Sequence, residues 1–498
     1  MSLQQLYLAL LVAGLVLLAS IVATRVADRV GLPSLLLFLA VGVAIGESGL
    51  GLEFSDVQLA SDLCTTALAV ILVEGGLTTK FADIRRLLGP AGVLSTVGVA
   101  VSIAVTAAAT HLLLGVSWQL AFLLGAIVSP TDAAAVFSIL RVLPLRRRVA
   151  GLLEAESGFN DAPAAIVVLM LCTTPLTVDV GNAVLGVVYE LAVGTAIGLA
   201  TGMLGAQALR RAALPASGLY PLAIFGLGMV AFAAAGTVHA SGFIAAYLSG
   251  VVLANSGLPH RAATRSFAEG LGWLAQIGLF VLLGLLVSPH RLAGELIPAL
   301  VIGAVLLLLS RPLSVVVSLT WFKVPWREQV FLSWAGLRGA VPIVLATFPI
   351  VEGVPGGLRL LNIVFILVVV YTLVQGPGLG VLAHWLRMIP RDATREIEVE
   401  AAPLDVLEAE LLTMTVRPKS RLHNVSVLEL RLPDPSVITL IIRRGHTFVP
   451  QPDTHIMVGD ELLIVTTTKT RASAERRLRA VSRRGKLAYW FGEYGHVD

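Results

Sequence analysis

Long apolar runs recur from the N-terminus to about residue 385, and short polar segments separate them. A run of about 18 or more apolar residues is long enough to cross a bilayer as a helix. The pattern therefore predicts an all-α polytopic membrane protein. Its thirteen expected spans cover residues 5–26, 32–50, 60–78, 88–113, 117–140, 149–174, 181–209, 218–238, 241–256, 269–288, 293–321, 328–350 and 360–385. The runs at 60–78 and 241–256 are the weakest, and losing one would invert the side of the C-terminus.

The composition supports this interpretation. Hydrophobic residues make up 56% of the 498 residues and charged residues only 14%, whereas a soluble protein carries about 25% charged residues. The mean hydropathy is +0.86. These values argue against a large soluble enzyme with an apolar core. Cys64 and Cys172 both fall in apolar runs, which favours small buried hydrophobic residues over a disulfide or a metal site.

The basic residues predict the orientation. Fifteen of them lie in the odd-numbered loops: Arg25, Arg29, Lys80, Arg85, Arg86, Arg141, Arg146, Arg147, Arg148, Arg210, Arg211, Arg261, Arg265, Lys323 and Arg327. The even loops carry essentially Arg291 and Arg359. Cytoplasmic loops hold the excess of Lys and Arg, so we expect an external N-terminus and a cytoplasmic C-terminus in the inner (plasma) membrane. The first run has no convincing cleavage site, which favours a span over a signal peptide.

The composition changes near Pro390. Residues 1–390 form the expected transmembrane domain, 391–403 a charged linker, 404–484 a small α/β domain and 485–498 a tail. Strand patterns occur at 411–416, 437–444 and 458–467, and a helix pattern at 470–481. Such a domain could sense a cytoplasmic signal or serve only in assembly.

The fifth span contains the sequence Ser129-Pro130-Thr131-Asp132. Pro130 lacks an N–H and opens the helix, which leaves backbone groups free to face an ion. Thr131 adds a hydroxyl oxygen and Asp132 a carboxylate. Ionisable residues inside spans are costly and usually functional, so we interpret this segment as part of an ion site and not as a simple kink.

The sixth span carries a second cluster between Glu154 and Pro163. Ser157 and Asp161 lie four residues apart and share one helix face. Asn160 neighbours Glu156 and Ser157 on the same helix. Three carboxylates and two neutral polar groups in eight residues of a hydrophobic span favour a functional site over a structural one. The role of Glu154 stays open.

The chemistry of these clusters favours an exchanger. A proton or a bound monovalent cation can neutralise one buried carboxylate, and either loaded form would then cross the low-dielectric interior more easily than the empty anion. The pair Asn160-Asp161 offers one titratable group. We therefore expect one proton per cation and no net charge movement.

Two further segments carry intramembrane charge, Glu74-Gly75-Gly76 in the third span and the stretch from Trp334 to Pro342 in the twelfth. An arginine in a bilayer interior needs a partner. Glu74 is the first candidate partner for Arg338, with Glu156 or Asn160 as alternatives. Arg311 also lies within an apolar run, beside Pro312, and its role stays open.

The fifth and twelfth spans are both interrupted by glycine or proline. They are seven spans apart and so run in opposite directions. Matching interrupted helices in two halves are typical of transporters built from inverted repeats.

The segments SPTDAAAV, ESGFNDAPA, LVEGGL and GLRGAVP together resemble the NhaP-like branch of the monovalent cation:proton antiporters over residues 5–388. The resemblance implies a thirteen-span fold with a core domain that moves like an elevator, a dimerisation domain, two unwound crossing helices and a homodimer. It implies that Thr131, Asp132, Ser157 and Asp161 bind K⁺ or Na⁺, with Asp161 also carrying the proton. Glu156 and Asn160 would support the site, and Glu74 and Arg338 would form a stabilising pair.

The tail resembles the TrkA-C regulatory domains of potassium channels and transporters. This resemblance implies a small regulatory ligand of unknown identity and favours K⁺ over Na⁺. Direct binding of NAD is not expected, because no Rossmann-like half precedes the domain.

Two other classes compete with an antiporter. A potassium channel or uniporter gated by the tail would need a carbonyl filter such as TVGYG, and the sequence has none. A membrane enzyme would need a nucleophile–base pair or a set of metal ligands, and neither pattern is found. We expect no catalytic activity, no cofactor and no nucleic-acid partner.

Overall fold

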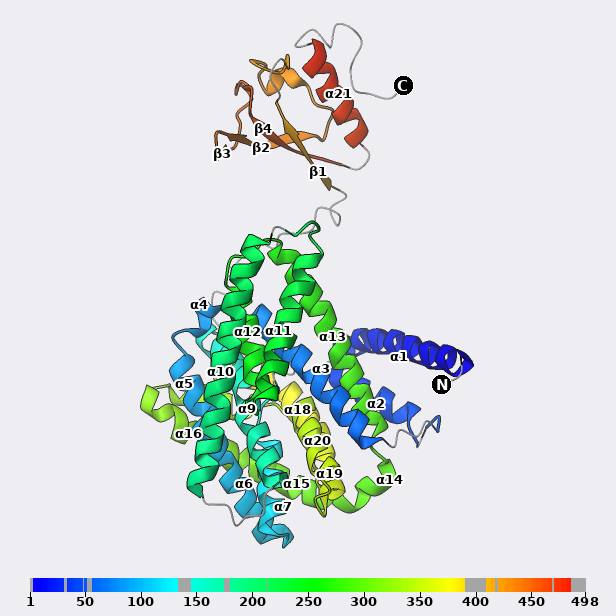
Figure 1. The fold of residues 1–498 in the computed structure, drawn as a ribbon, viewed down its shortest axis with the longest axis vertical. Helices are drawn as coiled ribbons and strands as arrows, with labels where there is room; N and C mark the ends of the chain where they lie inside the picture. The colour runs from blue at the N-terminus through cyan, green and yellow to red at the C-terminus, as the bar shows by residue number, and fades with distance from the viewer. Residues whose placement is uncertain are drawn as a thin grey trace. The chain divides into compact units, whose positions relative to one another are not determined.

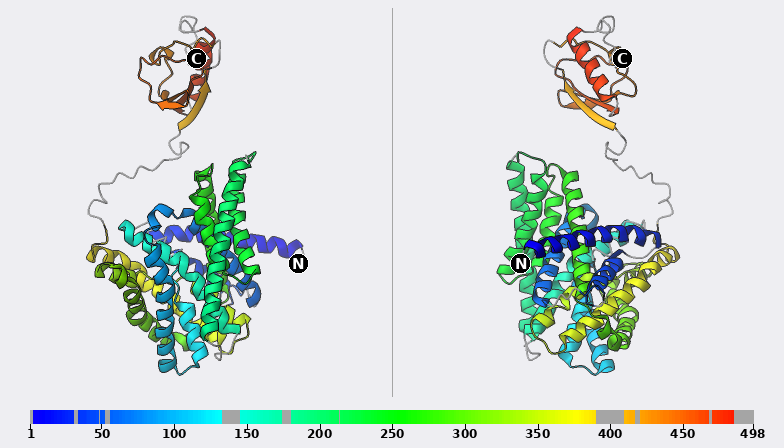
Figure 2. Two further views of the ribbon diagram at one scale, coloured as in Figure 1. Left: turned by 60° about the vertical axis from the view of Figure 1, so that its left-hand side comes forward. Right: turned by 90° about the vertical axis from the view of Figure 1, so that its right-hand side faces the viewer.

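The computed structural model describes the chain from Leu3 to Arg484 with internal gaps (Figures 1 and 2). The residues that it does not describe are 1–2, 31–33, 48, 52–55, 133–144, 174–179, 213, 390–408, 417–419, 468–469 and 485–498. The end of the fifth expected span, the expected linker, the first residues of the small domain and the tail lie outside the described residues. The chain forms two compact units, Met1–Ala393 and Thr394–Asp498, and each has its own hydrophobic core.

The first unit is built from helices (Figure 1). They are α1 (Leu3–Val30), α2 (Ser34–Ile45), α3 (Val57–Thr78), α4 (Phe81–Ile84), α5 (Leu88–Val93), α6 (Val99–Leu114), α7 (Trp118–Val128), α9 (Arg147–Thr173), α10 (Val180–Arg211), α11 (Leu219–Thr237), α12 (Gly242–Ala254), α13 (Arg261–Leu285), α14 (Pro289–Leu292), α15 (Leu296–Val305), α16 (Arg311–Leu319), α17 (Trp326–Trp334), α18 (Ala340–Leu345), α19 (Phe348–Val351) and α20 (Gly357–Trp385). π-helical turns at Leu94–Gly98 and Leu306–Ser310 join α5 to α6 and α15 to α16.

The helices agree with the hydrophobic pattern. Within the described part of the chain, nine helical stretches are long and apolar enough to cross a membrane, and four apolar stretches are shorter. Each of the thirteen expected spans overlaps one of these stretches. The multi-pass helical architecture is confirmed, and the exact number of crossings stays a prediction.

Three pairs of helices carry matching irregularities. The fourth and eleventh spans each contain a π-helical turn. The fifth and twelfth each contain non-helical backbone, and α9 and α20 each contain an internal proline, Pro163 and Pro377. The two members of each pair are seven spans apart in the predicted order. In that order an odd separation reverses the direction of a span, so the irregularities are consistent with the predicted inverted repeats, which stay a prediction.

Glycine pairs bring several helices into close contact. A Cβ on Gly76 in α3 would lie 3.1 Å from the Cα of Gly250 in α12. A Cβ on Gly42 in α2 would lie 2.9 Å from the Cα of Gly284 in α13. Small residues at crossings are typical of membrane helices, because their association depends on van der Waals contact and not on the exclusion of water.

Helix α1 extends away from the other helices of its unit in Figure 1 and packs mainly against α2. Most of its apolar side chains are exposed, and Leu8, Leu11 and Leu18 are each more than half exposed. An apolar surface of this size has to be covered by lipid or by another protein chain.

The second unit is a four-stranded antiparallel sheet with one helix. Its strands β1 (Ala409–Thr415), β2 (Val437–Arg443), β3 (His446–Phe448) and β4 (Glu461–Thr467) lie in the order β1-β4-β2-β3, and α21 covers Arg471–Arg484. The register pairs Ile441 with Leu462 and Leu411 with Val465. Arg444 and Gly445 both have positive φ, as a two-residue hairpin turn between β2 and β3 requires. The predicted strands and helix of this domain are all present.

A partly buried ion pair stabilises the turn before β4. Asp460 has no exposed surface. Its carboxylate accepts hydrogen bonds from Nε and Nη2 of Arg443, both at 2.8 Å, and from the backbone N–H of Met457 at 2.7 Å. Burial alone would raise the pKa of Asp460, but these hydrogen bonds outweigh burial, and the pKa lies below its usual value.

We predict that Asp460→Asn lowers the stability of this unit by about 1.5–3 kcal/mol at neutral pH, because it leaves the Arg443 guanidinium without its charged acceptor. A carboxylate with a lowered pKa stabilises the fold above its unfolded value, and the stabilisation is lost as the pH falls through the folded value. The stability of the variant should therefore fall less than that of the wild type when the pH is lowered. Hydrogen exchange of the β4 amides in the full-length protein measures both effects. The exposed control Asp453→Asn should change neither, and equal effects in the two variants would contradict the prediction.

Candidate functional site

Two non-helical segments, one in the fifth expected span and one in the twelfth, meet inside the first unit. Helix α7 ends at Val128, and the described residues 129–132 that follow are not helical. Residues 335–339 separate α17 from α18 in the same way. The backbone N–H of Asp132 donates to the carbonyl of Leu337 at 3.0 Å. Each non-helical segment therefore satisfies backbone groups that the other leaves free.

The carboxylate of Asp132 lies at the start of α18. Its Oδ2 accepts a hydrogen bond from the backbone N–H of Ala340, the first residue of that helix, at 2.8 Å. The first N–H groups of a helix carry partial positive charge and have no partner within the helix. The start of α18 thus stabilises the negative charge of Asp132, which is only 2% exposed.

Gly339 makes this approach possible. A Cβ on Gly339 would lie 1.7 Å from Oδ2 of Asp132, far inside van der Waals contact. Any residue other than glycine would have to displace the carboxylate or the start of α18. The second glycine of the GLRGAVP segment is therefore required by the close contact between Asp132 and the start of α18.

Polar side chains of α9 face this junction. The hydroxyls of Thr131 and Ser157 are 3.0 Å apart, and Nδ2 of Asn160 donates to the Thr131 hydroxyl at 2.7 Å. The sequence placed Ser157 and Asn160 on the same helix as Asp161, and the structure brings Thr131 to them from the fifth span. The junction therefore contains four of the predicted site residues: Thr131, Asp132, Ser157 and Asn160.

Asp161 differs from the other buried acids of the site. It is 1% exposed, yet neither carboxylate oxygen has a hydrogen-bond partner among the described residues, and Oδ1 of Asn160 has none either. Asp161 interacts electrostatically with Asp132. Unpaired oxygens of this kind are the ligands that hard monovalent cations prefer, and a carboxylate among them can alternatively take up a proton.

The ion pairs differ from the prediction. Arg311 in α16 and Glu156 in α9 form a buried bidentate pair, in which Nη1 donates to Oε1 and Nη2 donates to Oε2 at 2.8 Å. Sequence reasoning left the role of Arg311 open and placed Glu156 near Arg338 only as an alternative. The missed signal is the position of Arg311 within an apolar run, because a buried guanidinium demands a carboxylate.

The hydrogen bond of Arg338 goes to a different partner from the predicted Glu74. Arg338 is 1% exposed, and its Nη1 donates to the carbonyl of Pro130 at 2.9 Å. Glu74 is also buried but lies against α13, where a Cβ on Gly272 would be 2.9 Å from its Cγ. The spacing along the sequence could not show that a carbonyl in the non-helical backbone of the fifth span accepts the hydrogen bond of the guanidinium.

The family models agree with this architecture. The model of the transmembrane sodium/hydrogen exchanger matches residues 16–385, and the model of the TrkA-C domain matches residues 411–479. Among solved structures, the sodium proton antiporter MjNhaP1 from Methanocaldococcus jannaschii superimposes with a TM-score of 0.66 at 22% identity, over 76% of this chain and 99% of that chain. At this level of identity the likeness establishes a shared fold.

Curated relatives extend over nearly the whole chain. The K(+)/H(+) antiporter NhaP of Alkalimonas amylolytica is 36% identical over 469 residues, which cover 92% of this chain and 81% of the relative. The K(+)/H(+) antiporter NhaP2 of Shewanella baltica is 32% identical over 494 residues, which cover 97% and 85%. The resemblance drawn from the sequence motifs is confirmed: the chain belongs to the sodium/hydrogen exchanger family and carries a TrkA-C domain behind its transmembrane part.

Proposed function

We propose that this protein is a secondary antiporter that exchanges a monovalent cation for a proton by competition at Asp161. The observation that carries the proposal is the state of Asp161. Its carboxylate is buried, has no hydrogen-bond partner in the described part of the chain, and lies one helical turn after Ser157, whose hydroxyl is 3.0 Å from that of Thr131. A buried anion without a partner is costly. A proton or a cation relieves that cost, and the two cannot do so at the same time.

The roles of the neighbouring side chains follow from their contacts. Thr131, Asp132 and Ser157 would contribute oxygen ligands to the cation together with Asp161. Asn160 would orient the Thr131 hydroxyl, to which it donates. Glu156 would hold α9 against α16 through Arg311. Alternating access then requires the junction of the two interrupted helices to move relative to the rest of the bundle.

The relatives favour K⁺ as the transported cation, because both curated relatives described above are named K(+)/H(+) antiporters. None of the four oxygen-bearing side chains excludes Na⁺. A channel or uniporter gated by the TrkA-C domain is disfavoured by membership of an exchanger family and by the absence of a filter sequence.

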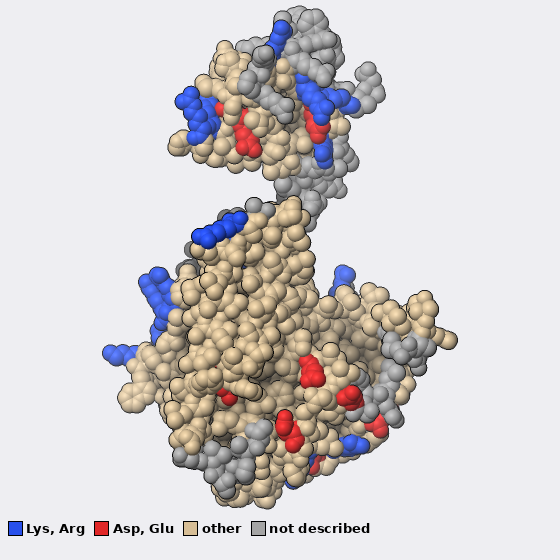
Figure 3. Space-filling view, viewed as in Figure 1, with Lys and Arg blue, Asp and Glu red and all other residues tan. Residues whose placement is uncertain are grey.

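The orientation and assembly are part of the same proposal. On the face of the transmembrane unit drawn in Figure 3, most Lys and Arg side chains lie toward the upper end and the left edge, and most Asp and Glu side chains lie lower. This segregation supports a plasma-membrane protein with its basic end and its TrkA-C domain in the cytoplasm. The exposed apolar surface of α1 supports a homodimer in which a second chain covers it. The TrkA-C domain would bind a small regulatory ligand.

We predict that Asp161→Asn reduces exchange to the level of protein-free vesicles, because asparagine keeps the size of the side chain and removes its titratable charge. A pH-sensitive dye inside proteoliposomes, with steps of external K⁺ or Na⁺, measures the exchange. The wild-type protein should respond more strongly to K⁺. Cation-driven proton movement that survives the substitution would refute the competition mechanism.

We predict that Gly339→Ala also abolishes exchange while the protein remains monodisperse, because the added methyl group displaces the Asp132 carboxylate. The matched control is Gly236→Ala in α11, where a Cβ would meet no atom within 4 Å. Both variants are assayed in the same proteoliposomes. Full activity of Gly339→Ala would mean that the contact between Asp132 and α18 does not matter for transport.

We predict electroneutral exchange of one cation for one proton, because Asn160 leaves Asp161 as the titratable member of the pair. Proteoliposomes adsorbed to a solid-supported membrane should give no transient current on a K⁺ jump, although the dye reports proton movement under the same conditions. A current that Asp161→Asn abolishes would contradict this stoichiometry.

A further inference from the structure

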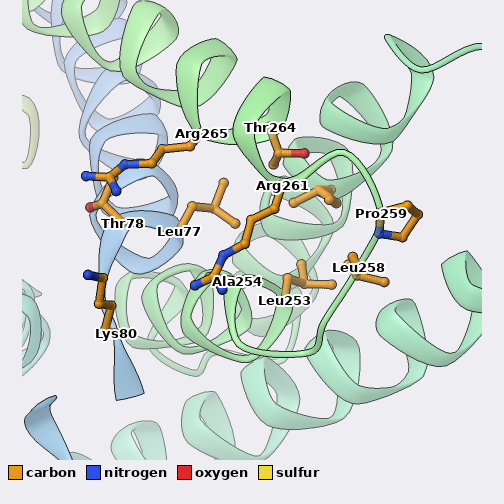
Figure 4. A pocket seen from close by; sticks show the side chains of 11 residues that line it. Leu77, Thr78, Lys80, Leu253, Ala254, Leu258, Pro259, Arg261, Thr264 and Arg265 are labelled. Carbon is orange, nitrogen blue, oxygen red and sulfur yellow. The ribbon is translucent and has the colours of Figure 1, made fainter. Parts of the chain in front are cut away.

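A hollow with basic side chains lies where α3 ends and α13 begins (Figure 4). Its floor is apolar and includes Leu77, Leu253 and Leu258. Lys80 and Arg261 stand at its rim. Because α3 ends and α13 starts there, the hollow opens at one end of the helical bundle and combines a charged rim with an apolar interior.

The positive charge of this hollow is poorly compensated. Lys80, Arg261 and Arg265 all line it. Within the described part of the chain, neither Lys80 nor Arg261 forms an ion pair, and Arg265 pairs with Glu269 at 3.0 Å in an exposed position. Exposed pairs of this kind contribute little. The hollow therefore retains an excess of positive charge that an anion would neutralise.

The directions of the side chains suit one anionic group. In Figure 4 the Arg261 side chain extends across the hollow toward Ala254. Lys80 lies on the other side of the hollow, just after the end of α3. Arg265 lies beside Thr78 on the same side as Lys80. A guanidinium matches the oxygens of a phosphate in a bidentate manner, and an ammonium adds a point charge.

We propose that this hollow binds the phosphate group of an anionic phospholipid. The phosphate would lie between Lys80 and Arg261, and the glycerol and the first acyl carbons would lie on the apolar floor. Basic pockets between membrane helices are suited to such headgroups. A free phosphate ion would use the same cations but not the apolar floor, which is why the lipid is the favoured source. With the orientation proposed above, the lipid belongs to the cytoplasmic leaflet, but binding itself depends neither on that orientation nor on exchange.

The bound lipid would connect the ends of helices that line the hollow. The hollow is formed by residues from α3, α11, α12, α13, the loop before α13 and the short connection after α3 that carries Lys80. α3 carries Glu74 and packs closely on α12 through Gly76. A phosphate that bridges Lys80 and Arg261 would fix the end of α3 against the start of α13. We therefore expect the lipid to raise the thermal stability of the full-length protein.

The test compares phosphatidylglycerol with phosphatidylcholine, each added to the full-length protein in a neutral detergent. Native mass spectrometry counts the bound lipids, and a thermal shift reports stabilisation. Phosphatidylglycerol should bind and stabilise the wild-type protein, and phosphatidylcholine should not. Lys80→Gln with Arg261→Gln should weaken phosphatidylglycerol binding roughly 10- to 30-fold, at about 1 kcal/mol per charge near the surface.

Two controls make the result specific. Arg85→Gln with Arg86→Gln removes two exposed charges that follow α4 outside the hollow and should leave binding nearly unchanged. Ala254→Phe keeps every charge but fills the apolar floor, and it should also weaken binding. This second variant tests the site even where the double charge variant fails to fold.

The outcomes that would overturn the proposal are distinct. Equal loss of binding in the two double charge variants would mean general surface attraction. If Lys80→Gln with Arg261→Gln and also Ala254→Phe bind phosphatidylglycerol as well as the wild type does, the hollow is not the binding site. Stabilisation by inorganic phosphate alone, equal to that by phosphatidylglycerol, would assign the hollow to a soluble anion. None of these results depends on the transport assay, so failure of the lipid proposal and failure of the proposed exchange can be told apart.

Discussion

The contact between Asp132 and the first turn of α18 is the interaction on which the rest of the site depends. Two broken helices inside a membrane leave backbone groups without partners, and each such group costs several kcal/mol unless protein satisfies it. Here each break supplies partners for the other, through the Asp132 N–H, its carboxylate and the carbonyl of Pro130. Neither break would be stable alone, so the two halves of the bundle have to fold against each other.

Much of the fold could be predicted because its causes are local. Apolar runs predicted the helices, and the strand patterns of the small domain predicted β1, β2 and β4. The polar clusters around Asp132 and Asp161 were visible because charged residues inside a span stand out against it. Their meeting was expected from the family resemblance, whereas spacing along the chain established only the shared face of Ser157 and Asp161.

The partner of each buried charge could not be predicted in the same way. Arg338 had three candidate acceptors in the sequence. Its hydrogen bond goes instead to the backbone carbonyl of Pro130, which belongs to a non-helical segment. Glu156 pairs with Arg311, which lies 155 positions away. The partner of a buried charge depends on how three or four helices cross. The residue pattern within one helix does not contain that information.

The charges buried at the junction explain why one carboxylate is left for exchange. Glu156 is neutralised by Arg311 in a direct pair. Asp132 is stabilised by the start of α18, and Arg338 supplies a positive charge on the neighbouring non-helical segment. Counted over these five ionisable side chains, three are negative and two positive, so a single negative charge remains. Of the three carboxylates, that of Asp161 has no hydrogen-bond partner among the residues that the structure describes. One proton or one monovalent cation brings this group of side chains to neutrality, whereas two would overcharge it in a medium where an uncompensated charge is expensive. The proposed one-for-one exchange would thus depend on the number of fixed arginines around the site, and not on Asp161 alone.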